Sequence, residues 1–414
     1  MESVRWQALE RCVRFLESNS QIQPGGYKFT GPIPDTTVSN KELTALLDLA
    51  CQIQQVQSPT FDEGERAAFM LEQFRRLGLS EVHLDAAGNA LARLPGENPG
   101  RKPVVLSAHL DTVFARQPEL PLKRMEDWIV GPGIGDNSLS LAALISTVNW
   151  LKKAGRTLTG DVWLAANVCE EGLGNLRGMR ALVDEFGDRP LAYLILEGMG
   201  LGNIYTRGLG VSRYRIQIDT PGGHSWSNYG QPSAIHEMGR LVARLADLSL
   251  PSSPRTSLNI GVISGGTTVN SIASHASIDL DLRSVSSQTL GFIETQVITL
   301  AGNFQQTNVQ VRVESIGKRD AGEISTKHPL VEIARCVIED LGVVPKLEVG
   351  STDANIPLSR GLPAICIGLT QGAKAHTQEE YILTEPLRNG FRQVLQLLQW
   401  IWVTDPEKRP NAGR

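Results

Sequence analysis

The sequence lacks the long apolar runs and like-charge blocks that would place it in a specialised class of protein. No apolar stretch approaches the 18 residues of a membrane-spanning helix, so we expect no membrane partner. The 40 basic and 44 acidic residues are dispersed and leave a net charge of −4, which disfavours nucleic acid as a partner. Residues 1–17 form a charged amphipathic pattern without an apolar signal core, which predicts a cytoplasmic location.

Cysteine is also scarce, and its spacing does not indicate a metal or disulfide motif. The five cysteines are odd in number and no two of them have CxxC spacing. Several lie inside apolar runs, so we expect buried free thiols in a reducing compartment. These cysteines are Cys12, Cys51, Cys169, Cys336 and Cys366.

What is present is an ordinary globular composition in a chain of 414 residues, enough for two or three domains. Continuous apolar runs, as expected of strands covered on both faces, alternate with amphipathic helical patterns. This alternation predicts an α/β fold with helices on both faces of a sheet. The runs lie at residues 104–114, 161–172, 191–198 and 363–370, and helical patterns at 41–55, 61–77, 138–154 and 177–186.

From about residue 210 the pattern changes to half-buried strands whose polar and apolar residues alternate. The order of predicted elements over 210–320 is β-α-β-β-α-β, the split βαβ arrangement of an α+β, ferredoxin-like domain. Because the earlier pattern resumes afterwards, we expect this domain to be inserted into a catalytic domain formed by residues 41–209 and 321–414. Residues 1–40 are expected to form an N-terminal extension.

Histidines and carboxylates follow every one of the four apolar runs. In an open α/β sheet, ligands bind at the carboxyl ends of the strands, so these side chains are expected to converge there. Two imidazoles and several carboxylates suit a divalent metal, zinc above all. The residues are His109 and Asp111, Glu170 and Glu171, Glu197, and His376, with Asp136 supplied by a separate loop.

That loop, GPGIGDNSLS (131–140), has two interpretations. Its glycines before a helical run are typical of a phosphate-binding turn, which would make the chain a nucleotide-binding enzyme. However, Asp136 lies where a phosphate would sit, and the preceding KRMEDWIV is a poor strand. A metal loop fits better, and the number of ligands suggests two metals. Asp136 is then the best bridging residue, because a carboxylate offers two oxygens.

The motifs together resemble the co-catalytic zinc peptidase family of peptidase T, carboxypeptidase G, acetylornithine deacetylase, succinyl-diaminopimelate desuccinylase and aminoacylase. The similarity extends from about residue 41 to the C-terminus, with the motifs in the family's order. They are HLDTV (109–113), GIGDNS (133–138), CEEGLGN (169–175), LEG (196–198), GGHSW (222–226), TTVNSI (267–272), DLR (281–283) and AHTQEEY (375–381).

The resemblance implies two zinc ions, with Co²⁺ or Mn²⁺ as substitutes. It implies that Asp136 bridges them, that His109 and Glu197 complete one site, and that Glu171 and His376 complete the other. Asp111 would support His109 without binding metal itself. Alternate residues of a strand face the same way, so the carboxylate of Asp111 can accept the imidazole N–H of His109. Glu170 would be the general base that takes the proton of the attacking water and passes it to the leaving amine.

In the inserted domain, the resemblance implies that His224 stabilises the oxyanion and that Asn270 and Arg283 bind substrate. In dimeric members the histidine reaches the partner's active site, so we expect a homodimer formed through the inserted domain. The segment 350–357 matches a family loop that lines the pocket. Glu197 lies where some members carry Asp, and a cis peptide after Asp136 is a further hypothesis from the family.

The predicted function is therefore hydrolysis of a peptide or amide bond in a small substrate, by a metal-activated water. A di- or tripeptide exopeptidase is the first choice, and an N-acyl amino acid deacylase with the same site is the alternative. A relative that binds metal or peptide without catalysis is a further alternative. Its sign would be a missing base or ligand, and none is missing from the sequence.

Overall fold

The computed structural model describes residues 36–404, so Cys12 and nearly all of the expected N-terminal extension lie outside the described residues. The chain divides into two compact units, which we treat separately. Unit 2 comprises Arg207–Gly322 and Val349–Ser351, and unit 1 comprises the described residues on either side of these segments. Within the described residues, no helix has the length and apolarity needed to cross a membrane.

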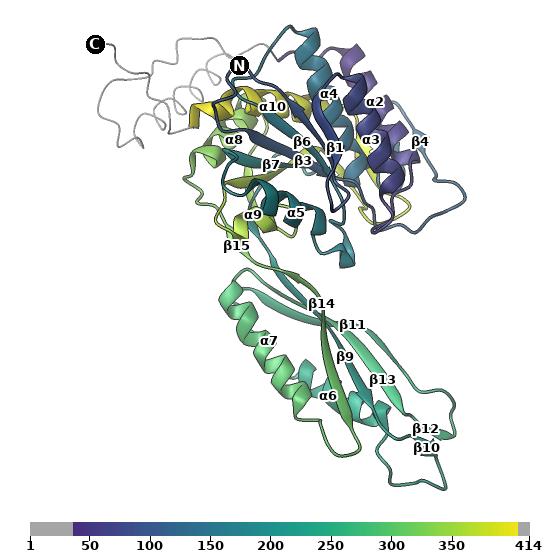
Figure 1. Ribbon diagram of the computed structural model, residues 1–414. Coiled ribbons are helices and arrows are strands. Elements are labelled where there is room, and N and C mark those ends of the chain that lie inside the picture. Colours follow the sequence, from purple (N-terminus) through teal and green to yellow (C-terminus); the bar gives the residue numbers. More distant parts are fainter. Residues whose placement is uncertain (1–35, 405–414) are drawn as a thin grey trace, which may run out of the picture. The chain divides into compact units, whose positions relative to one another are not determined.

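A nine-stranded mixed sheet forms the centre of unit 1 (Figure 1). Its four central strands, β6, β3, β7 and β17, run parallel and are almost wholly buried, which confirms the strands predicted from the apolar runs. The strand order is β1 (Ser80–Leu84), β2 (Ala90–Leu94), β6 (Val162–Asn167), β3 (Val104–His109), β7 (Ala192–Met199), β17 (Ala364–Thr370), β8 (Asn203–Gly208) and β15 (Gly322–Glu323), with β16 (Lys346–Gly350) beside β8.

Helices cover both faces of this sheet, as expected. The connection β3–α4–β6 moves one way across the sheet and β6–α5–β7 moves the other way. Because such crossovers are right-handed, α4 and α5 must lie on opposite faces, as Figure 1 shows. The helices of unit 1 are α2 (Asn40–Gln55), α3 (Gly64–Arg76), α4 (Leu139–Lys153), α5 (Arg177–Phe186), α8 (Pro329–Asp340), α9 (Asn355–Ser359) and α10 (Leu387–Trp400), with single turns at Ile134–Ser138, Gly172–Gly174 and Ile401–Thr404.

A small antiparallel sheet at the edge of unit 1 joins two loops that are far apart in sequence. Its order is β18 (Gly372–Ala373), β19 (Tyr381–Leu383), β5 (Trp128–Val130) and β4 (Lys123–Arg124). The sequence was not expected to form a strand before Gly131, so β5 corrects that expectation. β5 nevertheless lies outside the central sheet, so the strand that a nucleotide-binding turn requires is still missing. The β5–β19 pairing places loop 131–137 beside loop 374–380.

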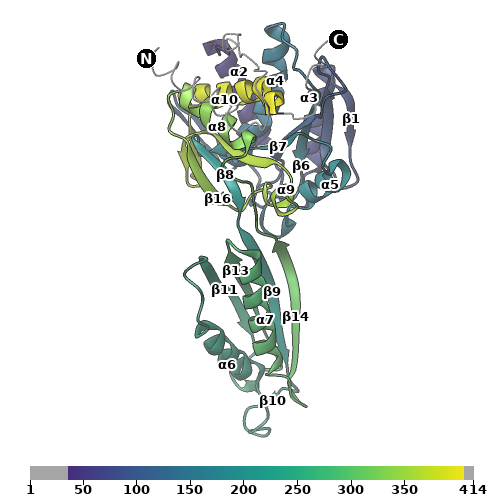
Figure 2. The same cartoon turned by 90° about the vertical axis from the view of Figure 1, so that its left-hand side faces the viewer.

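Unit 2 has the predicted β-α-β-β-α-β order. Its sheet order, β11-β13-β9-β14, is antiparallel throughout and matches the split βαβ arrangement. Burial alternates strictly along β13, and helices α6 and α7 both pack against this sheet (Figure 2). The elements are β9 (Gly210–Asp219), α6 (Ala234–Ala246), β11 (Thr256–Gly265), β13 (His275–Ser284), α7 (Ser287–Gly302) and β14 (Gln310–Arg319), with a two-stranded ribbon of β10 (Gly223–His224) and β12 (Ser271–Ile272).

The cysteines only partly follow the expectation of free thiols. Cys51, Cys169 and Cys366 are free, and the last two are buried. Burial and the neighbouring carboxylate of Glu63 together raise the pKa of the Cys169 thiol to about 12. Cys336 is disulfide-bonded, which corrects the expectation at that position.

Candidate metal centre

Six of the residues predicted from sequence come together at the carboxyl ends of the parallel strands. His109 is the last residue of β3 and Glu197 lies near the end of β7, while the others lie on loops. They form three overlapping groups whose ligand atoms lie within 4.8 Å of one another. The groups are His109–Asp136–Glu197, Asp136–Glu171–His376 and His109–Glu170–Glu171.

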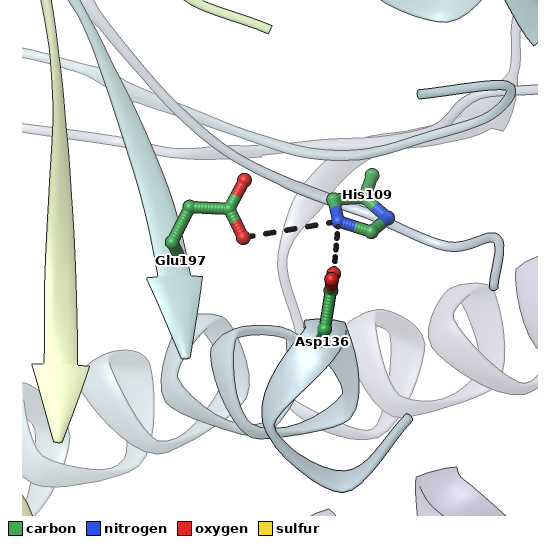
Figure 3. A group of neighbouring side chains, drawn as sticks. All are labelled: His109, Asp136 and Glu197. Atoms are coloured by element: carbon green, nitrogen blue, oxygen red, sulfur yellow. Dashed lines mark ion pairs between the residues drawn. The ribbon is translucent and has the colours of Figure 1, made fainter. Parts of the chain in front are cut away.

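Asp136 lies at the centre of this cluster. Its Oδ1 is 3.0 Å from Nε2 of His109, and its Oδ2 is 3.1 Å from Nε2 of His376. Figure 3 shows the first of these contacts together with Glu197. Burial raises the pKa of Asp136, but the two histidines outweigh this effect and hold the pKa below its usual range. Each oxygen of one carboxylate therefore faces a different imidazole.

The first group is built around His109, which is almost wholly buried. Its Nδ1 lies 3.0 Å from the main-chain carbonyl of Asp111, so this nitrogen carries the proton and donates it. Nε2 faces Oδ1 of Asp136 and Oε2 of Glu197, which is 3.9 Å away. Burial lowers the pKa of His109, but Asp111 and Asp136 outweigh this effect and hold the pKa well above its usual range, so Nε2 carries a proton that a bound metal would displace. The Nδ1 hydrogen bond therefore holds the ring in the orientation and tautomer that a metal ligand needs.

The surroundings of Glu197 disfavour its ionised form. Burial raises its pKa well above the usual range; His109 lowers it, while the charges of Asp136 and Glu170 raise it again. His109 is the one positive charge among the groups that shift this pKa, and its effect is smaller than that of burial. A bound cation would supply further positive charge.

The second group lies on the more open side of the cluster. Nε2 of His376 is 3.1 Å from both Oδ2 of Asp136 and Oε1 of Glu171. The ring of His376 is half exposed, and its backbone has φ 65°, a left-handed conformation that is unusual outside glycine. The hydrogen bonds with Asp136 and Glu171 raise the pKa of His376 to about 10.

Asp111 fixes the segment that carries the two adjacent glutamates. Its Oδ1 accepts the backbone N–H of Glu170 and its Oδ2 that of Glu171, both at 2.9 Å. Oδ2 also accepts the hydroxyl of Thr60 at 3.0 Å. The carboxylate lies 3.6 Å from Nδ1 of His109, farther than the main-chain carbonyl of the same residue. Asp111 therefore acts on the cluster mainly by holding the backbone of Glu170 and Glu171.

The Gly-rich turn of loop 131–137, which carries Asp136, is packed too tightly for side chains. Gly133 has φ 73°, and a Cβ there would lie 2.8 Å from Cγ2 of Thr112. A Cβ on Gly135 would lie 2.9 Å from side-chain atoms of Ile382 and Met199. The peptide bond between Asp136 and Asn137 is cis, which confirms the family-based hypothesis. These glycines thus let the loop run close to β7 and β19.

Two buried carboxylates near the cluster were missed at the sequence level. Glu380 accepts three backbone N–H groups of loop 131–137, and Glu63 accepts the backbone N–H of Cys169 at 3.1 Å. Burial and the charge of Asp136 raise the pKa of Glu380, the three N–H groups lower it, and the pKa is about 7 as a result. Glu380 is part of the AHTQEEY motif, but in sequence it looks like one of a solvated pair with Glu379.

The donor set of the cluster fits divalent metal ions. It contains two imidazole nitrogens and four carboxylates, which are the ligand types that zinc takes in proteins. Within residues 36–404, the ion pairs of Asp136, Glu171 and Glu197 are all made with His109 or His376. Two ligand triads that share Asp136 match the geometry of a paired-metal site.

In unit 2, the structure brings His224 and Asn270 together on the β10–β12 ribbon. The backbone N–H of Ser225 donates to the carbonyl of Asn270 at 3.0 Å. Nδ1 of His224 accepts the backbone N–H of Trp226 at 3.2 Å, so in the neutral ring the proton is on Nε2. The exposed His224 therefore presents an N–H donor to solvent, as oxyanion stabilisation requires.

Arg283 does not share this ribbon. It lies near the far end of β13 from His275, and strand geometry puts these two residues about 26 Å apart. Its Nε donates to Oδ1 of Asp281 at 2.6 Å, and Arg213 donates to the other oxygen of Asp281 at 3.0 Å. Within one chain, Arg283 thus lies away from the ribbon that carries His224 and Asn270.

Segment 350–357 contributes a buried carboxylate beside β6. Asp353 is inaccessible to solvent, and its Oδ2 accepts the side-chain N–H of Asn167 at 2.6 Å. The charge of Asp353 contributes to the raised pKa of Glu197, so the two carboxylates are electrostatically coupled.

Comparison with known proteins gives matches over most of the chain. A sequence profile described as Peptidase family M20/M25/M40 matches residues 105–400. The chain is 25% identical to the putative succinyl-diaminopimelate desuccinylase DapE of Mycobacterium tuberculosis, over 77% of this chain and 88% of that one.

Two solved structures extend the comparison to the fold. Aminopeptidase PepT of Bacillus cereus superposes with a TM-score of 0.71 at 23% identity, covering 87% of this chain and 98% of that one. YxeP of Bacillus subtilis, described as a dinuclear metal binding peptidase from the M20 family, has a TM-score of 0.64 at 15% identity, covering 88% of this chain and 100% of that one.

Proposed function

The chain belongs to the peptidase family M20/M25/M40, and from this membership we propose a dinuclear zinc hydrolase that cleaves a peptide or amide bond of a small substrate. Membership makes it a hydrolase of peptide or amide bonds; the metal identity, substrate and residue roles are our proposal. The observation that carries it is Asp136, whose two carboxylate oxygens face two imidazoles on separate loops at 3.0 and 3.1 Å.

We assign five residues to the two metals. Asp136 is shared, His109 and Glu197 complete one site, and Glu171 and His376 complete the other. Zinc is favoured over magnesium or calcium because each site contains an imidazole nitrogen, while those cations prefer oxygen ligands only. When bound, the pair of cations lowers the pKa of a water molecule and polarises the scissile carbonyl.

Glu170 is assigned as the general base. It is buried, and a carboxylate oxygen lies in the same group as ligand atoms of His109 and Glu171. Its backbone N–H is held by Asp111, so the carboxylate is presented from a fixed segment. From this place it can take a proton from the attacking water and transfer it to the leaving nitrogen.

Unit 2 supplies the groups that we assign to the substrate. The outward Nε2–H of His224 suits the developing oxyanion, and the side chain of Asn270, next to it, suits a substrate carbonyl or carboxylate. Arg283 is assigned to a substrate carboxylate, which it would bind after exchanging Asp281 as its partner. A terminal carboxylate is common to small peptides and N-acyl amino acids.

A di- or tripeptide is our first choice of substrate, and an N-acyl amino acid is the alternative. The test is a panel of dipeptides, tripeptides and N-acyl amino acids assayed with zinc-loaded protein, after chelation and after zinc is restored. We expect hydrolysis of at least one peptide that chelation abolishes and zinc restores. Hydrolysis of acyl amino acids alone would favour the deacylase, and no hydrolysis would favour a silent relative.

Glu170→Gln provides the matched catalytic control for this panel, because glutamine has the size of glutamate but does not accept a proton near neutral pH. We expect its activity to fall by about 10²–10⁴-fold with metal content unchanged. Wild-type activity in this variant would overturn the assignment of the general base.

We also propose that the chain forms a homodimer through unit 2. Strand β11 is an edge of its sheet, so one row of its backbone N–H and C=O groups has no strand partner within residues 36–404. Val262 and Ile263 on this strand are exposed, as are the aromatic residues Trp226 and Tyr229 that follow β10. Pairing of two copies along β11 would cover these groups.

We further propose a cytoplasmic location. The free thiols of Cys51, Cys169 and Cys366 support a reducing compartment, whereas the disulfide at Cys336 is unusual there. Cell fractionation of the native host tests this location directly, and recovery of the chain outside the cytoplasmic fraction would contradict it.

A further inference from the structure

Glu380 is a wholly buried carboxylate that the proposed reaction does not use. Its Oε1 accepts the backbone N–H groups of Gly135 at 2.7 Å and Asp136 at 2.8 Å. Its Oε2 accepts the backbone N–H of Gly133 at 3.0 Å. Three N–H groups of one short loop therefore converge on a single side chain, and one of them belongs to Asp136 itself.

The main chain of the same residue adds a fourth connection, because the carbonyl of Glu380 accepts the N–H of Gly131 at 2.8 Å. The next residue, Tyr381, pairs with Val130 in the small sheet. Glu380 thus fastens loop 131–137 from its first residue to Asp136. This contact joins segments that are about 245 residues apart in sequence.

Glu380 lies in the loop that also carries His376. This loop, residues 374–380, joins β18 to β19, and its turn is closed by the N–H of Glu380 donating to the carbonyl of Thr377 at 3.2 Å. His376 reaches Oδ2 of Asp136 from one end of the loop, while Glu380 holds the backbone of Asp136 from the other. One short loop therefore controls both members of the His376–Asp136 contact.

Burying a charged carboxylate costs free energy unless strong hydrogen bonds compensate for the lost hydration. A neutral amide side chain could accept only at one oxygen, whereas the carboxylate accepts at two. Both oxygens of Glu380 accept backbone N–H groups, which is the arrangement of an ionised carboxylate. Hydrogen bonds to such a charged acceptor are about twice as strong as neutral ones, which restricts the loop more tightly. The arrangement is suited to holding a catalytic carboxylate to within a fraction of an ångström.

We propose that Glu380 is a positioning residue that fixes the carboxylate of Asp136 between the two metals and so determines how tightly the pair is bound. This proposal rests on the proposed function of the cluster. Glu380 touches neither the substrate nor the ligand side chains; it acts through the backbone of loop 131–137. It deepens the proposed site by naming the residue that holds its shared ligand in place.

The test compares Glu380→Gln with wild type and with Asp340→Asn. Glutamine keeps the volume and one acceptor oxygen, but it turns an NH₂ group toward one of the three N–H donors. Asp340 is a matched control, because it is a buried carboxylate in unit 1 that accepts the side-chain N–H of Gln396 on α10 at 3.2 Å. Glu380→Ala serves as a second variant without any acceptor.

Metal binding is the main measurement, by titration of chelator-treated protein with Zn²⁺ against a competing chelator, and with Co²⁺ by its visible absorption. We expect Glu380→Gln to weaken uptake of the metal pair by about 10–100-fold and to change the Co²⁺ spectrum. The kcat for the best peptide should fall while KM changes little. Asp340→Asn should leave affinity and spectrum at wild-type values.

Wild-type metal affinity and an unchanged Co²⁺ spectrum in both Glu380 variants would overturn this proposal alone. So would a loss of affinity that Asp340→Asn matches in size, since both would then reflect general destabilisation. A wild-type chain that takes up no metal would overturn the proposed function and this proposal together. Metal uptake by the wild-type chain therefore distinguishes failure of the Glu380 proposal from failure of the proposed function.

Discussion

At the scale of single residues, the candidate site is organised by carboxylates that hold backbone rather than metal. Asp111 holds the N–H groups of Glu170 and Glu171, Glu63 holds that of Cys169, and Glu380 holds those of the loop that ends at Asp136. The segments of Glu170–Glu171 and of Asp136 are thus held in place by buried carboxylates. Such outer partners commonly affect metal affinity and activity nearly as strongly as the ligands do.

The sequence identified the residues that face one another but not all of those that hold them. The six clustered residues stand out because each follows an apolar strand or a Gly-rich turn. Glu380 and Glu63 carry no such signal, since only their burial separates them from solvated glutamates such as Glu379. Burial of this kind depends on contacts between distant segments, which local patterns do not encode.

The role of Asp111 leads to a first prediction. Asparagine at this position would present an NH₂ group to one of two backbone N–H donors, which shifts the segment of Glu170. We expect Asp111→Asn to lower kcat by about 10–100-fold. Thr60→Ala is the control, because it removes one hydroxyl donor to Asp111 and leaves both backbone contacts; we expect less than about a tenfold loss. Steady-state kinetics of the two variants provide the measurement. A wild-type kcat in Asp111→Asn would contradict this role of Asp111.

A second prediction concerns pH. The pKa of His376 is raised from 6.5 to about 10 by Asp136 and Glu171, so the protonated ring stabilises the folded chain fully below about pH 6.5. This contribution is lost as the pH rises through about 10. Because metal binds only the neutral imidazole, uptake near neutral pH must release a proton, and affinity should rise with pH, up to about tenfold per unit for each proton released.

Zinc uptake in weakly buffered solution containing a pH indicator measures this release directly. Affinities determined with a competing chelator at two pH values, below and above neutrality, provide the second measurement. Uptake without proton release, at an affinity independent of pH, would contradict the assignment of His376 as a ligand.

At the scale of helices and strands, buried elements were predicted well and edge elements poorly. The four central strands and helix α5 occur where continuous apolar runs and helical patterns indicated. The edge strands β1 and β16 and the short strands β4 and β5 have mixed exposure and few residues, so no periodicity marks them. These strands depend on neighbours in the sheet, as β5 does on β19.

Strand β11 provides the prediction that belongs to this scale. Lysine at Val262 or Ile263, which are 55% and 63% exposed, should weaken a dimer that pairs along this edge. The fold should be unaffected, because neither side chain is buried within the chain. Val344→Lys is the control, since Val344 is 74% exposed in unit 1. Sedimentation velocity should show a shift toward monomer for the β11 variants only; an equal mass for all the variants would contradict a β11 interface.

At the scale of the whole molecule, the two units carry complementary parts of the proposed reaction. Unit 1 holds the metal cluster and Glu170, and unit 2 holds His224 and Asn270 on one ribbon. The fold class, including the inserted α+β unit, was predicted correctly from the change of periodicity near residue 210. Local sequence patterns do not show on which chain the ribbon acts. The expectation that it acts in the active site of a partner chain comes from the family resemblance.

Mixing two inactive variants tests whether His224 acts in the active site of a partner chain. If His224 acts in the partner's site, mixing Glu170→Gln with His224→Ala chains creates heterodimers in which one site has both groups intact. With random exchange, about a quarter of wild-type activity should return from two nearly inactive parents. If His224 served its own chain, the mixture would remain as inactive as the parents. Steady-state assays of the mixture after subunit exchange provide the measurement.

The central claim is that Asp136 bridges two metal ions, and a zinc-soaked crystal structure with anomalous data tests it most directly. We predict two anomalous peaks about 3.5–4 Å apart, each within bonding distance of one oxygen of Asp136. One peak should also contact His109 and Glu197, and the other Glu171 and His376. A single peak, or two peaks of which neither contacts Asp136, would contradict the account.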